Sequence, residues 1–291
     1  MKANGTLLML ISALIFSTTA VFTRIVALDG IHPFWIVEIR TAIATAFFAI
    51  LILSSADSRK GSVTFFTGKD KPALKYALIA AFCFFINLIC YSFALKFATA
   101  SAVSVLINMS PVFAVLFSFV VGADLINRSR IFGAVISSAG AAIVVFQPGN
   151  TSGNIEGYIS AIGSAIVWSL FVVYSAKAMR SCDRNVLNFV TMAFCAIACI
   201  PLALLSPWQA SFKGIAYVAV LGILNTGIVY VIYQKGLKET GPVAASILTT
   251  VSPIFTVALD FVMLGIVPSP LFVAGAGMVI MGILLCKRCR S

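Results

Sequence analysis

The chain has 291 residues, of which 61% are apolar and only 10% are charged, and its mean hydropathy is +1.08. Soluble domains carry about a quarter charged residues and under half apolar ones, so this composition excludes a soluble protein and indicates that lipid surrounds most of the chain. The formal net charge of +11 does not indicate a nucleic-acid partner, because the basic residues stand in short runs between apolar segments.

Ten apolar stretches follow one another along the chain, each of the roughly 17–25 residues that a membrane-spanning helix needs. The first five lie near residues 5–26, 33–53, 73–95, 100–122 and 130–147. The second five lie near residues 155–178, 186–206, 212–234, 241–264 and 270–286. Because these runs are continuous rather than alternating, they exclude a membrane β-barrel. We therefore predict an all-α integral membrane protein with ten transmembrane helices.

The basic residues between these stretches indicate the orientation of the chain. If the N-terminus is cytoplasmic, 16 of the 20 Lys and Arg residues fall in the inner segments. Only Arg24, Lys96 and Lys213 fall on the outer side, and Arg40 lies inside a helix. Since cytoplasmic segments are enriched in Lys and Arg, we predict that both termini are cytoplasmic.

A polar, Gly-rich segment at 147–154 divides the ten stretches into five and five, which predicts repeats over 1–147 and 153–291. When the chain is shifted by 142 residues, 15 of the 50 positions in 91–140 are identical. A repeat with an odd number of helices must enter the membrane from the opposite side in its second copy. Two inverted five-helix repeats are typical of transporters that work by alternating access.

Short motifs recur at matching places in the two halves. An aromatic residue precedes a serine in the first and sixth helices, and a Ser-Pro pair lies in the fourth and ninth. Glycines seven residues apart occur in the fifth and tenth helices. In the second helix, Pro33 precedes Arg40 by seven residues. The duplicated motifs are Phe16-Ser17 with Trp168-Ser169, Ser110-Pro111 with Ser252-Pro253, and Gly133/Gly140 with Gly275/Gly282.

Through these motifs the chain resembles the EamA branch of the drug/metabolite transporter superfamily over nearly its whole length. Members export amino acids and drugs or exchange metabolites and nucleotide sugars, so the resemblance implies transport without fixing the substrate. It also implies a central cavity surrounded by helices one, three, four, six, eight and nine. One departure concerns the Leu-Gly-Glu usual in helices four and nine, where this chain has Val121-Gly122-Ala123-Asp124 and Leu264-Gly265-Ile266-Val267.

Polar and aromatic side chains at membrane depth are the candidates for binding the solute, because such groups face a cavity or another helix. For the Asn and Tyr residues, interhelical hydrogen bonding is an equal alternative. Arg40 either binds a substrate carboxylate or extends towards the interface. A cavity with so few charges suits neutral or zwitterionic solutes. The predicted set is Ser17, Arg40, Asn87, Tyr91, Asn108, Trp168, Asn225 and Tyr230.

Two carboxylates and two prolines inside the predicted helices are candidates for mechanistic roles. Glu38 and Asp260 are the candidate proton carriers, since lone carboxylates in the membrane serve coupled transport; hydration near the outer interface is the alternative. We expect Glu38 to reach Arg24, and Asp260 to face no cation. Pro111 and Pro253 lack an amide donor, which predicts hinges there, with tolerated packing kinks as the alternative.

The residues do not indicate a metal site or a cofactor. Cys286 and Cys289 form a Cys-x-x-Cys, but a zinc site needs further ligands, and the only histidine, His32, is far away in sequence. An enzyme should show clustered nucleophiles, acid–base groups or metal ligands at membrane depth, and a receptor should show long loops. We therefore expect no catalytic residues, no metal and no cofactor.

The function that the sequence predicts is secondary transport of a small organic solute by alternating access, with export as the expected direction. The solute is an amino acid, a related metabolite or a drug, and the expected location is the bacterial inner membrane. The alternatives are an uncoupled facilitator of the same fold and, from another class, a membrane-embedded lipid-processing enzyme or receptor. The expected partners are the substrate and the lipid bilayer. We expect a monomer, with a dimer left open.

Overall fold

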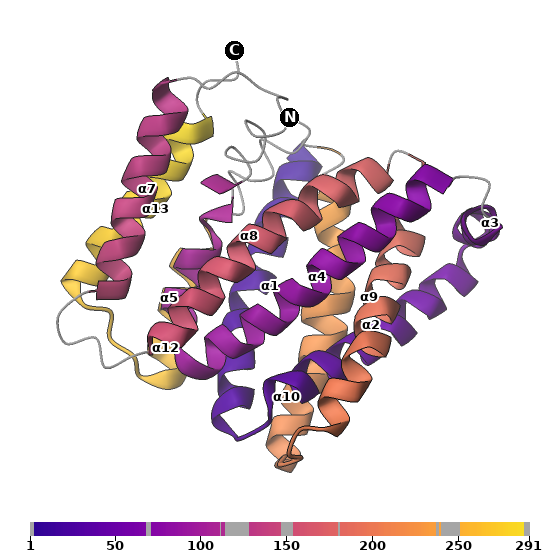
Figure 1. Ribbon diagram of the computed structural model, residues 1–291, viewed down its shortest axis with the longest axis horizontal. Helices are drawn as coiled ribbons and strands as arrows, with labels where there is room; N and C mark the ends of the chain where they lie inside the picture. The colour runs from indigo at the N-terminus through magenta and orange to yellow at the C-terminus, as the bar shows by residue number, and fades with distance from the viewer. Residues whose placement is uncertain are drawn as a thin grey trace.

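The computed structural model describes residues 3–67, 71–110, 112–113, 128–146, 154–179, 181–236, 239 and 251–287. The elements formed by these residues are all helices (Figure 1). Those of the first half of the chain are α1 (Ala3–Leu28), α2 (Pro33–Ser54), α3 (Ala56–Phe66), α4 (Lys71–Phe97), α5 (Ala100–Ile107) and α7 (Arg128–Phe146). Those of the second half are α8 (Ile155–Ala178), α9 (Arg184–Leu204), α10 (Phe212–Gly222), the π-helix η1 (Ile223–Ile228), α12 (Ser252–Leu264) and α13 (Pro270–Lys287).

Among the described residues, six helices are long and apolar enough to cross a membrane, which confirms the predicted all-α membrane class. Two shorter apolar helices, Ser252–Leu264 and Pro270–Gly282, accompany them. The predicted spans at 100–122 and 241–264 are described only in part, since 111, 114–122 and 241–250 lie outside the described residues. The six helices are Gly5–Leu28, Pro33–Ser54, Ala73–Phe97, Ile155–Ser175, Arg184–Leu204 and Phe212–Gly236.

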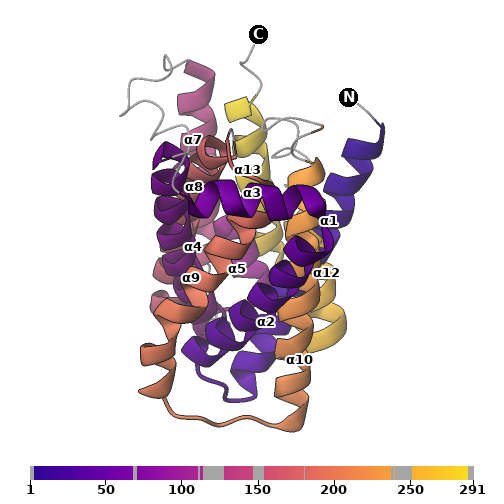
Figure 2. The same ribbon diagram turned by 90° about the vertical axis from the view of Figure 1, so that its right-hand side faces the viewer.

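Several helices begin at side chains that accept hydrogen bonds from the first free amides. The Asp183 carboxylate accepts from two amides at the start of α9. The hydroxyls of Ser55 and Ser211 accept in the same way at the starts of α3 and α10. At α2, Pro33 occupies the first turn, where its missing amide costs nothing. The sequence did not predict the short α3, which lies crosswise to the other helices (Figure 2).

Three long pairings join a helix of the first half to a helix of the second. α4 packs along α8, α7 along α13, and α2 along α9. Figure 1 shows α7 and α13 as a pair at one side of the molecule, beside α5 and α12. In both views the first described residues of α1 and the last of α13 lie at the same end of the molecule (Figures 1 and 2).

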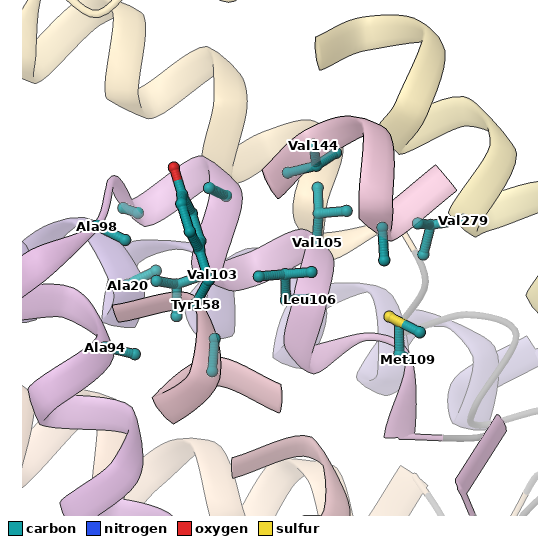
Figure 3. Packing of buried hydrophobic residues seen from close by; sticks show 14 of the residues in the cluster. Ala20, Ala94, Ala98, Val103, Val105, Leu106, Met109, Val144, Tyr158 and Val279 are labelled. Carbon is teal, nitrogen blue, oxygen red and sulfur yellow. The ribbon is translucent and has the colours of Figure 1, made fainter. Parts of the chain in front are cut away.

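A buried apolar cluster fills the space between α1, α4, α5, α7, α8 and α13 (Figure 3). Its members come from both halves of the chain, and many of them are small. Small side chains let helices approach closely, which matters in lipid because lipid tails are as apolar as the side chains and give no hydrophobic drive for association. The labelled members are Ala20, Ala94, Ala98, Val103, Val105, Leu106, Met109, Val144, Tyr158 and Val279.

The contact between α7 and α13 is a direct approach of two backbones. A Cβ added at Gly140 would lie 2.6 Å from the Gly275 carbonyl oxygen, and one added at Gly275 would lie 2.9 Å from the Gly140 carbonyl oxygen. Side chains do not tolerate such distances from a backbone atom, so both positions require glycine. This contact gives a physical reason for two of the glycines in the duplicated motif.

We predict that Gly140→Ala destabilises the protein, because the added methyl group must push α13 away from α7. The free energy of unfolding should fall by about 1–3 kcal/mol, measured as a lower apparent melting temperature of the protein in detergent. Gly277→Ala is the matched control on α13, since a Cβ there meets nothing within 4 Å. Equal melting temperatures for the two variants would contradict the backbone contact.

Candidate functional site

The helix α2 and the π-helix η1 approach each other at two glycines. A Cβ added at Gly222 would lie 2.7 Å from the Cβ of Ile43, and one added at Gly227 would lie 2.9 Å from the Cδ1 of Phe47. Larger residues at these positions would therefore separate the two helices. The close approach brings Arg40, a buried residue of α2, into contact with η1.

Within η1 the backbone hydrogen bonds slip by one residue. The Val229 amide donates to the Leu224 carbonyl, five residues back. The Thr226 hydroxyl donates to the Leu221 carbonyl at 2.8 Å, so this carbonyl has a hydrogen-bond partner where the helical pattern changes. Such π-helical turns occur often at functional sites. The slip places two polar residues, Thr226 and its neighbour Asn225, fully buried on one turn.

Arg40 is the buried cation of the site, with only 2% of its surface exposed. Its Nε donates to Thr226 Oγ1 at 3.0 Å. The proton of that hydroxyl is donated to the Leu221 carbonyl at the end of α10, so the oxygen is the acceptor for Arg40. The Nη1 of Arg40 is buried and has no hydrogen-bond partner among the described residues. The hydroxyls of Tyr91 and Tyr230 and the Cys195 thiol lie within electrostatic range of the guanidinium. The side chain is therefore held inside the helix bundle and does not extend to an interface.

Asn225 is oriented by three oxygen atoms of α1. Its Nδ2 donates to the Ile15 carbonyl at 2.8 Å, to Thr18 Oγ1 at 2.8 Å and to Thr19 Oγ1 at 2.9 Å. Because a carbonyl oxygen can only accept, the amide nitrogen must face α1. The Oδ1 of Asn225 is buried, and the part of the chain that the structure describes offers it no hydrogen-bond partner.

An aromatic cluster, defined here as Phe16, Phe84, Trp168, Phe171 and Tyr230, lies beside the buried cation. The Tyr230 ring meets Phe16 at a centroid distance of 5.8 Å and Phe84 at 5.6 Å, both edge to face. Phe84 in turn meets Trp168 at 6.3 Å and Phe171 at 4.7 Å. Phe84 and Tyr230 are buried, whereas Phe16 and Trp168 remain partly exposed. The cluster therefore joins α1, α4, α8 and the helical residues 229–236 after η1 through ring contacts.

Three of the predicted binding residues use their polar groups in contacts within the protein. The Nδ2 of Asn87 donates to the carbonyl oxygen and the Oγ of Ser164, at 3.0 and 2.7 Å, and so joins α4 to α8. The Nδ2 of Asn108 and the Oγ of Ser17 each donate to a carbonyl of their own helix, at 2.8 and 2.6 Å. For Asn87, these contacts favour the alternative of interhelical hydrogen bonding.

The remaining predicted residues lie in different surroundings. Pro253 lies in the first turn of α12, where a missing amide is tolerated, and Pro111 lies outside the described residues. Glu38 is half-buried on α2, and its Oε2 is buried without a hydrogen-bond partner from any described residue. Arg24, expected near Glu38, donates instead from its Nη1 to the carbonyls at the end of α4.

The turn between α4 and α5 is bound by three other elements, and we call Arg24, Ser101, Asn154 and Asp260 the α4–α5 corner. Arg24 Nη1 donates to the carbonyls of residues 95 and 96 at 2.7 and 2.6 Å, and the Asn154 amide donates to the carbonyl of residue 97 at 2.9 Å. These carbonyls end α4 and have no partner inside their own helix. The corner therefore ties α1 and α8 to the end of α4.

Asp260 binds the same corner from α12 and is fully buried. Its Oδ2 accepts from the Ser101 amide at 2.7 Å and from the Ser101 hydroxyl. Arg24 lies within electrostatic range of this carboxylate, which corrects our expectation that Asp260 faces no cation. A carboxylate at the start of α5 and a guanidinium at the end of α4 also complement the dipoles of these helices.

Some residues that build the site stand outside the predicted set. Two of them could have been found from the sequence. Thr226 follows the predicted Asn225, and Phe16 lies in the aromatic-Ser motif. Ser164 aligns with Ser12 when the first helices of the two halves are compared. Nothing in the sequence distinguishes Phe84, because one phenylalanine in an apolar helix resembles any other.

The chain is similar to known proteins in both sequence and fold. The model of the EamA-like transporter family matches residues 3–146 and 155–287. The chain is 27% identical over 274 residues to an uncharacterized transporter of Clostridium kluyveri, which covers 90% of this chain and 86% of the relative. It is 25% identical over 175 residues to the aromatic amino acid exporter YddG of Ancylobacter novellus, which covers 58% and 60% of the two chains. A crystal structure with 20% sequence identity aligns with 100% of both chains at a TM-score of 0.66, which shows a likeness of fold.

We predict that Asp260→Ala destabilises the α4–α5 corner, because the substitution leaves the Ser101 amide buried without its acceptor. The free energy of unfolding should fall by about 1–3 kcal/mol, measured as a lower apparent melting temperature in detergent. Asp260→Asn keeps an oxygen that can accept from the amide and should lose less. An alanine variant as stable as the wild type would show that the carboxylate does not hold the corner.

Proposed function

Because the chain belongs to the EamA-like transporter family, whose model matches both of its halves, we propose that it is a secondary transporter that works by alternating access. Its family and its transporter relatives make it a multi-pass membrane transporter rather than an enzyme. The proposed cargo is a small organic solute, namely an amino acid, a related metabolite or a drug, and the proposed direction is export. The relative named as an aromatic amino acid exporter supports the amino-acid part. The proposed location is the bacterial inner membrane.

The proposed architecture is ten transmembrane helices in two inverted five-helix repeats, over 1–147 and 153–291, with both termini cytoplasmic. The two matches of the family model support the division into repeats. The pairings α2 with α9 and α7 with α13 support the symmetry, because each joins helices that hold the same place in their halves. The position of the ends of α1 and α13 on one side of the molecule supports the common location of the termini.

The observation that carries the transport proposal is a buried polar site whose hydrogen bonds cross between the halves. Arg40 of the first half donates to Thr226 of the second, and Asn225 of the second half donates to α1 of the first. Alternating access needs a solute site at the interface of two repeats that move against each other. A site assembled from both halves meets that requirement.

Counterflow in proteoliposomes tests the transport proposal. Vesicles loaded with one unlabelled solute each, from a panel of amino acids, metabolites and drugs, should accumulate the labelled form of the transported solute transiently above its equilibrium level. Vesicles of the same lipid without protein should show none. If folded protein gives no counterflow with any member of the panel, the chain does not transport solutes of these classes.

We propose Glu38 first as the proton carrier. Among the described residues each carboxylate keeps one buried oxygen without a partner, Oε2 of Glu38 and Oδ1 of Asp260, but the other oxygen of Asp260 is already bound by Ser101. Glu38→Gln should retain counterflow, which needs no gradient, and should lose the stimulation of net flux by a pH gradient. Asp260→Asn is the companion variant, and its flux is to be compared at equal amounts of folded protein. Gradient dependence that is unchanged in both variants would exclude both residues as carriers, and absence of any gradient dependence in the wild type would favour the uncoupled facilitator.

A further inference from the structure

The guanidinium of Arg40 keeps a buried donor that the described part of the chain leaves unused. Its Nε is bound to Thr226, but its Nη1 is buried and has no partner. A guanidinium that has lost its water and has no anion beside it is costly to keep. An acceptor that arrives from outside the chain would complete this site.

The chain offers no anion for this donor among its described residues. The groups within electrostatic range of Arg40 are the phenols of Tyr91 and Tyr230 and the thiol of Cys195, all neutral near pH 7 by their ordinary pKa values. The Glu38 carboxylate interacts with a different cysteine, Cys199 of α9. The Asp260 carboxylate is bound at the α4–α5 corner.

The aromatic cluster lies beside this donor. Tyr230 lies within range of the guanidinium and also makes edge-to-face contacts with Phe16 and Phe84 of the aromatic cluster. Trp168, whose ring meets Phe84, keeps part of its surface exposed, as Phe16 does. Flat apolar groups pack well against such rings. A single cation beside the aromatic cluster matches a solute with one negative charge and an apolar body.

We propose that this site binds a monocarboxylate with an aromatic or branched apolar body, its carboxylate on the Nη1 of Arg40 and its body against the aromatic cluster. The proposal rests on the proposed transport function and makes Arg40 the residue that selects for a carboxylate. Guanidinium and carboxylate groups form strong, charge-assisted hydrogen bonds. The free Oδ1 of Asn225, next to Thr226 on η1, is an acceptor for the ammonium group of a solute that carries one.

Ligands that differ in the carboxylate or in the amino group test what each group contributes to binding. Binding to purified wild-type protein is measured by ligand-induced shifts of the melting temperature over a concentration series. The ligands are L-phenylalanine, 3-phenylpropanoate, L-phenylalaninamide and phenethylamine, with L-leucine and L-leucinamide as the branched pair. At least one acid should bind about tenfold or more tightly than its amide, a difference of about 1.4 kcal/mol. Comparing phenylalanine with phenylpropanoate then shows whether the amino group contributes.

Variants of Arg40 test whether this residue causes the preference for an acid over its amide. In Arg40→Met the preference for acid over amide should disappear, and in Arg40→Lys part of it should remain. Arg59→Met, at an exposed arginine of α3, is the control and should keep the wild-type preference. A purely structural role for Arg40 would weaken all ligands alike, which the ratio of acid to amide detects.

Three results would overturn the proposal: no acid in the panel binds, no acid binds the wild type more tightly than its matched amide or amine, or Arg40→Met keeps the wild-type preference for the acid. Counterflow of a neutral or cationic solute without binding of any acid would reject the carboxylate site and leave transport standing. Absence of counterflow together with tight binding of an acid would reject the transport proposal instead.

Discussion

A backbone group that is buried away from water has to find its hydrogen-bond partner within the protein, so each buried place where a helix stops or slips needs donors and acceptors from elsewhere in the chain. The α4–α5 corner satisfies this constraint with groups from three other elements. Arg24 and Asn154 take the last carbonyls of α4, and Asp260 takes an amide at the start of α5. One turn of the first half thereby fixes α1, α8 and α12, and two of these belong to the second half.

The same constraint shapes the candidate binding site. The slip in η1 is accommodated by the hydroxyl of Thr226, which donates to the Leu221 carbonyl and turns a lone pair towards Arg40. Gly222 and Gly227 let this turn lie close enough to α2 for the contact to form. A backbone irregularity, two glycines and one threonine therefore hold a cation at a depth where an isolated charge is costly.

The sequence predicted the fold class well, because apolar content and run length are local properties of the chain. The site was harder to predict. The rule that polar groups at membrane depth face a cavity or another helix selected Arg40 and Asn87 equally, yet the Asn87 amide is used by Ser164 whereas Arg40 keeps a free donor. Which role a residue takes depends on the helix face opposite to it. The partner of Asp260 is 159 residues away in the chain, and no local pattern indicates such a contact.

The half-buried Arg24 and the buried Asp260 and Arg40 consequently differ in what holds their charges. Arg24 donates two hydrogen bonds to the backbone, Asp260 accepts two from Ser101, and the two side chains lie within range of each other's charge. Arg40 has one hydrogen bond to a hydroxyl, and the groups within its range are neutral phenols and a thiol. Arg24 and Asp260 repay the cost of burial by completing helix ends. Arg40 completes nothing of that kind, so the reason for a cation at its position is to be sought in a ligand rather than in the fold.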